Sequence, residues 1–329
     1  MDSRHFKKGE VIFEENDIGN TMYEVTAGAV GIFLDYGKES EEKLVEVRPG
    51  EIFGEMAVID GFPRSATAVA MEDTDVLEIP GESLERYFTE NPERIYYLMR
   101  RLSDRMRDLT QAYTDACGAV NEAKGIGYAK PSESLWQKIK RFAGLSGKMS
   151  AIADSNLVDR RYTEKREHGE GYVQRIVNLV KGDIVFKQGD ESFCMYDIHR
   201  GTVGIYSAYN TPEEKLLTKL TANQFFGEMG MIENKPRSAT AVALDSGTCV
   251  ELIYPGDLND LFRKNPDKVM MILTHLSSRL RQLTVDYYRV CQTLAEIEEA
   301  IELDRALPAE TRAWIEYYNM MSQYGIGWY

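Results

Sequence analysis

Two segments of the sequence place a Gly-Glu pair shortly before a Pro-Arg-Ser-Ala-Thr string. The first contains Gly54-Glu55 and Arg64, and the second contains Gly227-Glu228 and Arg237. The guanidinium fork of arginine matches the oxygens of a phosphate, and the serine after it can add a hydroxyl donor. The residues after each Gly-Glu pair predict a short helix whose first N–H groups favour an anion. Each segment therefore predicts a phosphate site.

The glutamates restrict what carries that phosphate. A carboxylate beside an anion is favourable only when it accepts hydrogen bonds from something else, and a sugar hydroxyl is a natural donor. Phosphate and ribose together indicate a nucleotide. The alternative is a structural ion pair between Glu55 and Arg64, and between Glu228 and Arg237, that braces the loop. The occurrence of the motif twice favours binding.

No catalytic residues recur beside the motif. No general base, nucleophile or metal-ligand cluster accompanies both copies, so we expect binding without catalysis, and no metal. The chain has only four histidines, and its four cysteines include no Cys-x-x-Cys pair. We expect the cysteines to be reduced thiols, buried or idle: Cys117, Cys194, Cys249 and Cys291.

The two motifs belong to a longer internal repeat. An offset of 173 maps residues 63–70 onto 236–243, and after one inserted residue Leu109-Thr110 maps onto Leu283-Thr284. The chain therefore contains two copies of one domain. The expected parts are a first domain with its long helix (1–124), a linker with a short basic helix (125–171), a second domain with its long helix (172–303) and a C-terminal helical segment (304–329).

Within each copy, short runs rich in Val, Ile, Phe and Tyr are separated by turn signals and predict strands. This pattern predicts a mainly β, or α+β, fold in which a jelly-roll β-barrel precedes a helix. From Ile95 and from Val269, apolar residues alternate steps of four and three, which is the a/d seam of a coiled coil. Because narrow seams need a partner, we expect the two helices, of about 28 residues each, to pack as a parallel pair. The pair would form within one chain, as a pseudo-dimer, or between two chains.

The linker contains one amphipathic stretch at residues 134–142 with the basic residues Lys138, Lys140 and Arg141. A helix that binds a membrane or a partner is one interpretation. A helix that packs Trp136 and Phe142 against its own domains is favoured. A last aromatic-rich helix is expected to begin near Pro308.

Composition limits the function classes. The chain has 329 residues, 43% of them apolar and 28% charged, which is typical of a globular protein. Its net charge of −14 disfavours DNA and anionic bilayers as partners. No apolar run approaches the roughly 20 residues of a membrane span, and the first residues do not resemble a signal peptide. We therefore expect a cytoplasmic protein.

The strings from Phe53 to Thr67 and from Phe226 to Thr240 resemble the phosphate-binding cassette of cyclic nucleotide-binding domains. The resemblance implies a β-barrel followed by helices, and a 3′,5′-cyclic nucleotide as ligand. It also implies that the glutamates bind the ribose 2′-OH and the arginines the cyclic phosphate, with further phosphate contacts from the serines. The implied site residues are Gly54, Glu55, Met56, Ala57, Arg64, Ser65, Ala66 and Thr110 in the first site, and Gly227, Glu228, Met229, Gly230, Arg237, Ser238, Ala239 and Thr284 in the second.

The same resemblance bears on the base. Thr110 and Thr284 lie at equivalent points of the two long helices, where relatives of the catabolite activator family place a threonine that contacts adenine. Domains selective for cGMP carry threonine directly after the cassette arginine, where this chain has Ser65 and Ser238. We therefore expect cAMP rather than cGMP. The alternative is that both threonines are surface residues.

Two related families suggest different outputs. Catabolite activators continue into a helix-turn-helix, which the last residues here do not resemble. Regulatory subunits of cAMP-dependent protein kinase have tandem domains preceded by docking and inhibitor segments, which are not expected before the first strand. The string Arg160-Arg161-Tyr162-Thr163 resembles a kinase recognition sequence but is read as a charged linker. The favoured interpretation is a non-enzymatic cAMP sensor that signals to a partner protein. The alternatives are a scaffold with vestigial sites and a kinase regulatory subunit.

Overall fold

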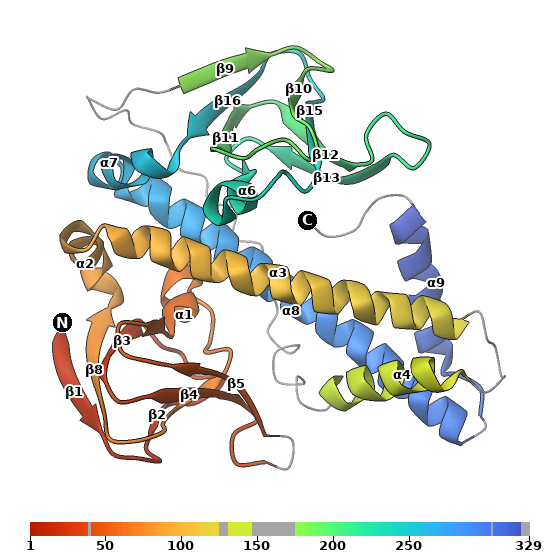
Figure 1. Cartoon of the computed structure of the whole chain (residues 1–329), viewed down its shortest axis with the longest axis horizontal. Coiled ribbons are helices and arrows are strands. Elements are labelled where there is room, and N and C mark those ends of the chain that lie inside the picture. The colour runs from red at the N-terminus through yellow and green to blue at the C-terminus, as the bar shows by residue number, and fades with distance from the viewer. Residues whose placement is uncertain (39–40, 125–130, 147–174, 304, 324–329) are drawn as a thin grey trace. The chain divides into compact units, whose positions relative to one another are not determined.

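The computed structural model describes residues 1–38, 41–124, 131–146, 175–303 and 305–323. In the first copy (Figure 1), the strands are β1 (Asp2–Phe6), β2 (Val11–Phe13), β3 (Thr21–Ala27), β4 (Val30–Leu34), β5 (Glu42–Val47), β6 (Ile52–Phe53), β7 (Thr67–Ala70) and β8 (Thr74–Pro80). The helix α1 (Glu55–Asp60) lies between β6 and β7, and a 3-10 turn (Gly81–Ser83), α2 (Leu84–Glu90) and α3 (Glu93–Lys124) follow β8. The string Arg160 to Thr163 lies outside the described residues.

The second copy repeats this order. Its strands are β9 (Arg175–Leu179), β10 (Ile184–Phe186), β11 (Met195–Arg200), β12 (Thr202–Ser207), β13 (Lys215–Thr221), β14 (Phe225–Phe226), β15 (Thr240–Ala243) and β16 (Thr248–Ile253). Its helices are α6 (Glu228–Glu233), a 3-10 turn (Pro255–Asp257), α7 (Leu258–Lys264) and α8 (Pro266–Glu302). Two further helices are α4 (Glu133–Ser146) and α9 (Ala309–Gln323).

Each copy contains two antiparallel four-stranded sheets. The strand orders are β1-β8-β3-β6 and β2-β7-β4-β5 in the first copy, and β14-β11-β16-β9 and β10-β15-β12-β13 in the second. The first core lies between its two sheets, because Val25 and Val76 from one sheet and Val30 and Val47 from the other join a single buried cluster. Because successive side chains along a strand point to opposite faces of the sheet, each sheet presents one apolar face to this core.

The predicted closed barrel is not found among the described residues. In the first copy, the ladders of the two sheets are separate, and the edge strands β6 and β2 have only two and three residues. Such short edges offer few N–H and C=O groups with which to continue a ladder from one sheet to the other. The arrangement of β-sheets followed by helices is as predicted.

A left-handed glycine opens each cassette helix. Gly54 precedes α1 with φ of +72°, and Gly227 precedes α6 with φ of +75°. Residues with a Cβ rarely adopt this conformation. The glycine of each Gly-Glu pair is therefore required by the backbone turn that leads from β6 or β14 into the helix.

The two long helices exceed the predicted length, with 32 residues in α3 and 37 in α8. Most seam residues are buried, including Ile95 and Met99 on α3 and Leu273 and Leu276 on α8. Buried residues also lie beside the seam, among them Leu98 and Ile272. The apolar face is broader than an a/d stripe, so a coiled coil is not confirmed.

The chain divides into two compact units. The first comprises Met1–Glu90, Arg105–Val158 and Ser277–Pro308, and the second comprises Asn91–Asp104, Asp159–Leu276 and Ala309–Tyr329. Each long helix is therefore divided, with its first part in the second unit and its remainder in the first. The first unit thus holds the C-terminal parts of both α3 and α8.

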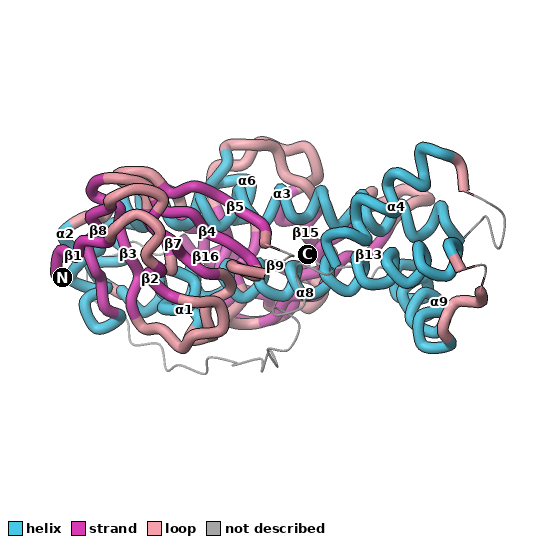
Figure 2. Tube along the Cα trace, turned by 90° about the horizontal axis from the view of Figure 1, so that it is seen from below, coloured by secondary structure: helices cyan, strands magenta, loops and turns pink. Residues whose placement is uncertain are grey.

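Contacts of α4 connect these helix parts within the first unit (Figure 1, Figure 2). Lys138 pairs with Glu122 of α3 at 3.0 Å and Lys140 pairs with Glu302 of α8 at 3.6 Å. The buried Phe142 packs edge-on against Tyr287 of α8. Two of the basic side chains of α4 are thus paired within the chain, and its apolar face packs on the chain itself.

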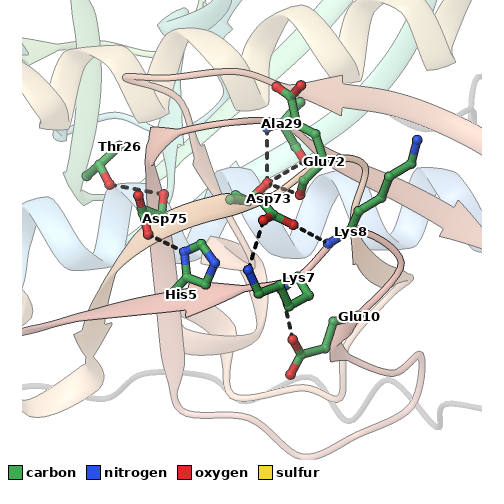
Figure 3. A network of polar contacts seen from close by, with 10 residues as sticks. His5, Lys7, Lys8, Glu10, Thr26, Ala29, Glu72, Asp73 and Asp75 are labelled. Atoms are coloured by element: carbon green, nitrogen blue, oxygen red, sulfur yellow. Dashed lines mark hydrogen bonds and ion pairs between the residues drawn. The ribbon is translucent and has the colours of Figure 1, made fainter.

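Figure 3 shows a polar network around the turn between β1 and β2. The Nζ of Lys7 and the backbone N–H of Lys8 donate to Asp73, at 3.0 and 3.1 Å. These hydrogen bonds hold the pKa of Asp73 below its ordinary value of 3.8. His5 contacts Asp75 nearby at 2.7 Å. The network fixes this turn against the loop before β8.

Among the residues that the structure describes, no helix combines the length and apolar character that crossing a membrane requires.

Candidate functional site

The first cassette arginine is enclosed by backbone. Arg64 is 4% exposed, its Nη1 donates to the Gly54 carbonyl at 2.7 Å and its Nη2 to the Thr21 carbonyl at 2.6 Å. The guanidinium carbon lies 4.2 Å from the centre of the Phe13 ring. A Cβ on Gly54 would lie 2.7 Å from Nη1, so the absence of a side chain there makes the contact possible.

The second cassette repeats the arrangement. Arg237 is 5% exposed and donates from Nη1 to the Gly227 carbonyl at 2.6 Å and from Nη2 to the Cys194 carbonyl at 2.7 Å. Its guanidinium carbon lies 4.2 Å from the centre of the Phe186 ring. These two hydrogen-bond distances agree with those of the first copy to within 0.1 Å.

Each arginine has one nitrogen that finds no partner in the described part of the chain. The Nε atoms of Arg64 and Arg237 are buried and make no hydrogen bond to the described residues. Burial lowers the pKa of Arg64, and the nearby Tyr23, Glu55 and Asp17 offset only part of this effect. A buried cation that donates only to carbonyls favours an anion as ligand, since an anion would satisfy Nε and neutralise the charge.

The alternative of an ion pair within the first cassette does not hold. Glu55 is buried and forms its ion pair with Arg105 of α3, whose Nη1 lies 3.3 Å from Oε1. The same nitrogen lies 3.4 Å from the Met56 sulfur. The sequence analysis missed Arg105, although the repeat offset that maps Thr110 onto Thr284 also maps Arg105 onto Arg279. Glu228 of the second cassette is 2% exposed.

The remaining cassette residues lie around these groups with different exposure. Ala57, Ala66, Gly230 and Ala239 are buried, as is Met56, whereas Met229 is partly buried. Ser65 is partly buried and Ser238 is exposed. The two serines therefore do not have equivalent surroundings.

A comparison with known families decides the assignment. The family described as cyclic nucleotide-binding domain matches residues 3–91 and 176–265, which together make up more than half of the chain. The chain belongs to the cyclic nucleotide-binding domain family. Each match covers one sequence copy from its first strand into the helices after its last.

Several named proteins are similar to this member of the family. The chain is 23% identical to the cAMP-dependent protein kinase regulatory subunit of Dictyostelium discoideum, over 79% of this chain and 67% of that protein. It is 35% identical to the Cyclic AMP receptor protein of Thermus thermophilus, over 32% of this chain and 49% of that protein. A co-crystal structure of the regulatory domain of Toxoplasma gondii PKA with cAMP shares 17% identity, with a TM-score of 0.26, and the match covers 83% of this chain and 84% of that one. The chain spans about half to two thirds of the two curated relatives.

The two threonines predicted to contact the base lie on the long helices. The hydroxyls of Thr110 and Thr284 donate to the carbonyls of Met106 and Leu280, at 2.7 and 2.8 Å. Each hydroxyl oxygen keeps lone pairs that can accept a hydrogen bond. Both residues belong to the first compact unit. The structure therefore does not place Thr284 in the unit that holds the second cassette.

A second cluster of ionisable groups lies in the sheet of β11 and β16. Asp197, His199 and Glu251 present ligand atoms within 4.8 Å of one another, which is a geometry that could hold a metal ion. Lys268 of α8, however, places Nζ 2.9 Å from Asp197 and also contacts Glu251. The ammonium therefore takes the position that a cation would need, and the donor set does not fit a metal.

The same contacts determine the ionisation of Glu251. Burial alone would raise its pKa, but the hydrogen bond to His199 and the charge of Lys268 together lower the pKa to about 2. The sequence analysis missed this cluster, because strand pairing aligns Glu251 with Leu77 of the first copy and no charge recurs there. Its position in the sheet gives it a role in stability.

Proposed function

We propose that this chain is a non-catalytic cyclic nucleotide sensor with one site in each copy and cAMP as its ligand. The observation that carries the proposal is the pair of buried arginines, each fixed by two carbonyls and each with an unpartnered Nε. In this proposal Arg64 and Arg237 bind the cyclic phosphate, and Ser65 and Ser238 add phosphate contacts. Glu55 and Glu228 accept from the ribose 2′-OH.

Binding in the first site would change the contacts of Glu55. Its carboxylate now pairs with Arg105, and a ribose hydroxyl would compete for the same oxygens. Since Arg105 is part of α3, a change at Glu55 would reach the long helix directly. This connection supports signalling to a partner protein by a conformational change of the helices.

Calorimetric titration of the purified chain with cAMP, cGMP and 5′-AMP tests this proposal. We expect two molecules of cAMP per chain, weaker binding of cGMP and no measurable binding of 5′-AMP, which lacks the cyclic phosphate. Displacement of labelled cAMP by cGMP at equal or lower concentration would contradict the choice of base alone. Absence of all cyclic nucleotide binding would contradict the proposal as a whole.

A second candidate function is regulation of a protein kinase. It is favoured by the similarity to a kinase regulatory subunit that extends over both copies and 79% of the chain. Addition of the chain to a cAMP-dependent protein kinase catalytic subunit would then inhibit phosphorylation of a peptide, and cAMP would restore it. If the kinase is unaffected while cAMP still binds, the sensor has a different partner.

A further inference from the structure

One position beside the arginines differs between the two copies. The offset of 173 maps Gly19 onto Ser192. The flanking backbone is equivalent, because the N–H groups of Arg64 and Arg237 donate to the carbonyls of Asp17 and Asp190, both at 2.8 Å. On the other side, the carbonyls of Thr21 and Cys194 accept from the Nη2 atoms. Residues 19 and 192 therefore occupy equivalent positions in the segment that contacts the cassette arginine.

The first copy has no room for a side chain at this place. A Cβ on Gly19 would lie 2.5 Å from both Nε and Nη2 of Arg64, which is closer than real Cβ contacts. In the second copy Ser192 does carry a side chain and is only 6% exposed. It belongs to the segment from Asp190 to Cys194, whose end carbonyls accept hydrogen bonds from Arg237.

A second difference makes room for that hydroxyl. A Cβ on Gly230 would lie 2.5 Å from the Ser192 Oγ and 2.7 Å from its Cβ. The residue that corresponds to Gly230 in the first copy is Ala57. The pairs Gly19 with Ala57 and Ser192 with Gly230 are thus complementary, and the hydroxyl of Ser192 lies directly against the start of α6.

The Ser192 hydroxyl has no partner among the residues that the structure describes. Oγ of Ser192 is buried and makes no hydrogen bond to the described residues, as is true of the Arg237 Nε. Within the described part of the chain, the second cassette therefore contains two buried donors without acceptors, whereas the first contains one, the Arg64 Nε. A buried hydroxyl without a partner costs stability unless a ligand supplies the acceptor.

We infer that Ser192 is a ligand-binding residue of the second site, where its hydroxyl donates to an oxygen of the cyclic phosphate beside Arg237. This inference rests on the proposed function. The second site then makes one hydrogen bond to the anion that Gly19 cannot make in the first, so it binds cAMP more tightly. A hydrogen bond to a charged group changes affinity about tenfold to a hundredfold.

The test removes only the oxygen. Ser192→Ala keeps Cβ and is made in a chain that also carries Arg64→Lys, which weakens the first site so that the second is measured alone. Calorimetry with cAMP should show binding at least about tenfold weaker than in the Arg64→Lys chain. The ratio of affinities for the Rp and Sp phosphorothioate analogues of cAMP should also change, because the hydroxyl faces one phosphate oxygen.

The first copy offers a matched control. Gly19→Ala, in a chain with Arg237→Lys, should weaken cAMP binding at the first site, because its Cβ would displace the Arg64 guanidinium. Unchanged affinity in Ser192→Ala, or weaker binding with an unchanged Rp to Sp ratio, overturns the role of Ser192 and leaves the two-site proposal in place. If the parent chain binds no cyclic nucleotide, the proposed function and this inference both fail.

Discussion

In the first copy, Glu24 on β3 accepts a hydrogen bond from the Tyr87 hydroxyl at 2.7 Å. At the corresponding place in the second copy, Asp197 on β11 contacts Lys268 and lies opposite Glu251 on β16. The strand registers pair Glu24 with Leu77 and Asp197 with Glu251. The paired strands thus carry one carboxylate at this place in the first copy and two in the second.

The arginine cradles, in contrast, are nearly identical in the two copies. The backbone around the two arginines is thus the same, while the groups farther along β3 and β11 differ. Buried charges make stability depend strongly on each partner, because loss of one partner leaves the other uncompensated. We therefore expect the second copy to be more sensitive than the first to single substitutions at this position.

The largest effect is expected from Lys268→Met. The substitution leaves Asp197 and Glu251 buried together without the ammonium of Lys268. The free energy required for local opening of β11 and β16 should therefore fall by about 3–5 kcal/mol. Hydrogen exchange of these strands measures the change, with β3 and β8 of the same chain as internal control. A change below about 1 kcal/mol in β11 and β16 would show that the charges are not a stabilising network.

Acid should affect the second copy through the same cluster. The pKa of Glu251 is about 2 in the folded protein and 4.5 ordinarily, so its contribution is present above pH 4.5 and is lost as pH falls toward 2. The first copy has Leu77 at the corresponding position and lacks this pH-dependent contribution to stability. Between pH 4.5 and 3, exchange protection of β16 should therefore decrease more steeply than that of β8. Equal slopes would contradict this explanation.

The long helices differ in a similar way. Asp286 on α8 is buried, and this burial raises its pKa from 3.8 to about 6, whereas the repeat places Ala112 on α3. A raised pKa means that stability falls as pH rises from about 4 to 6. Asp286→Asn should therefore increase the free energy of unfolding by ~3 kcal/mol at pH 7.5, at about 1.4 kcal/mol per pH unit, and much less at pH 4. Urea unfolding at both pH values measures this, and an equal effect at both would contradict it.

The smallest effect is expected from Tyr87→Phe in the first copy. The substitution removes the hydroxyl that donates to Glu24 and keeps the ring. The free energy required for local opening of β3 and β8 should therefore fall by about 1.5 kcal/mol. Hydrogen exchange measures it under the conditions used for Lys268→Met. A loss as large as that of Lys268→Met would remove the distinction between the two copies.

The repeat and the positions of the cassettes could be predicted from sequence, because a fixed offset of 173 is visible without structure. Gly54 and Gly227 were recognisable for the same reason, and both adopt the left-handed turn that explains them. Whether the cassettes bind as proposed remains a prediction. The closed barrel was not predictable from short strands alone, since closure depends on which edges meet.

Other features depend on contacts between residues far apart in sequence. Arg105 reaches Glu55 across 50 residues, and the division of α3 and α8 between two compact units has no local signal. Lys268 and Glu251 look like ordinary surface charges in the sequence, because charged residues are usually exposed. Burial of both becomes visible only when α8 is placed against the strand.

The central claim is that each copy holds one cyclic phosphate with its own buried arginine. Calorimetric titration with cAMP of the parent chain, Arg64→Lys, Arg237→Lys and the double variant tests it most directly. Lysine keeps the charge but loses the fork, so each single variant should retain one full-affinity site and lose about tenfold to a hundredfold at the other. The double variant should be weakened at both. A double variant that binds cAMP with the parent's affinity and stoichiometry would contradict the account.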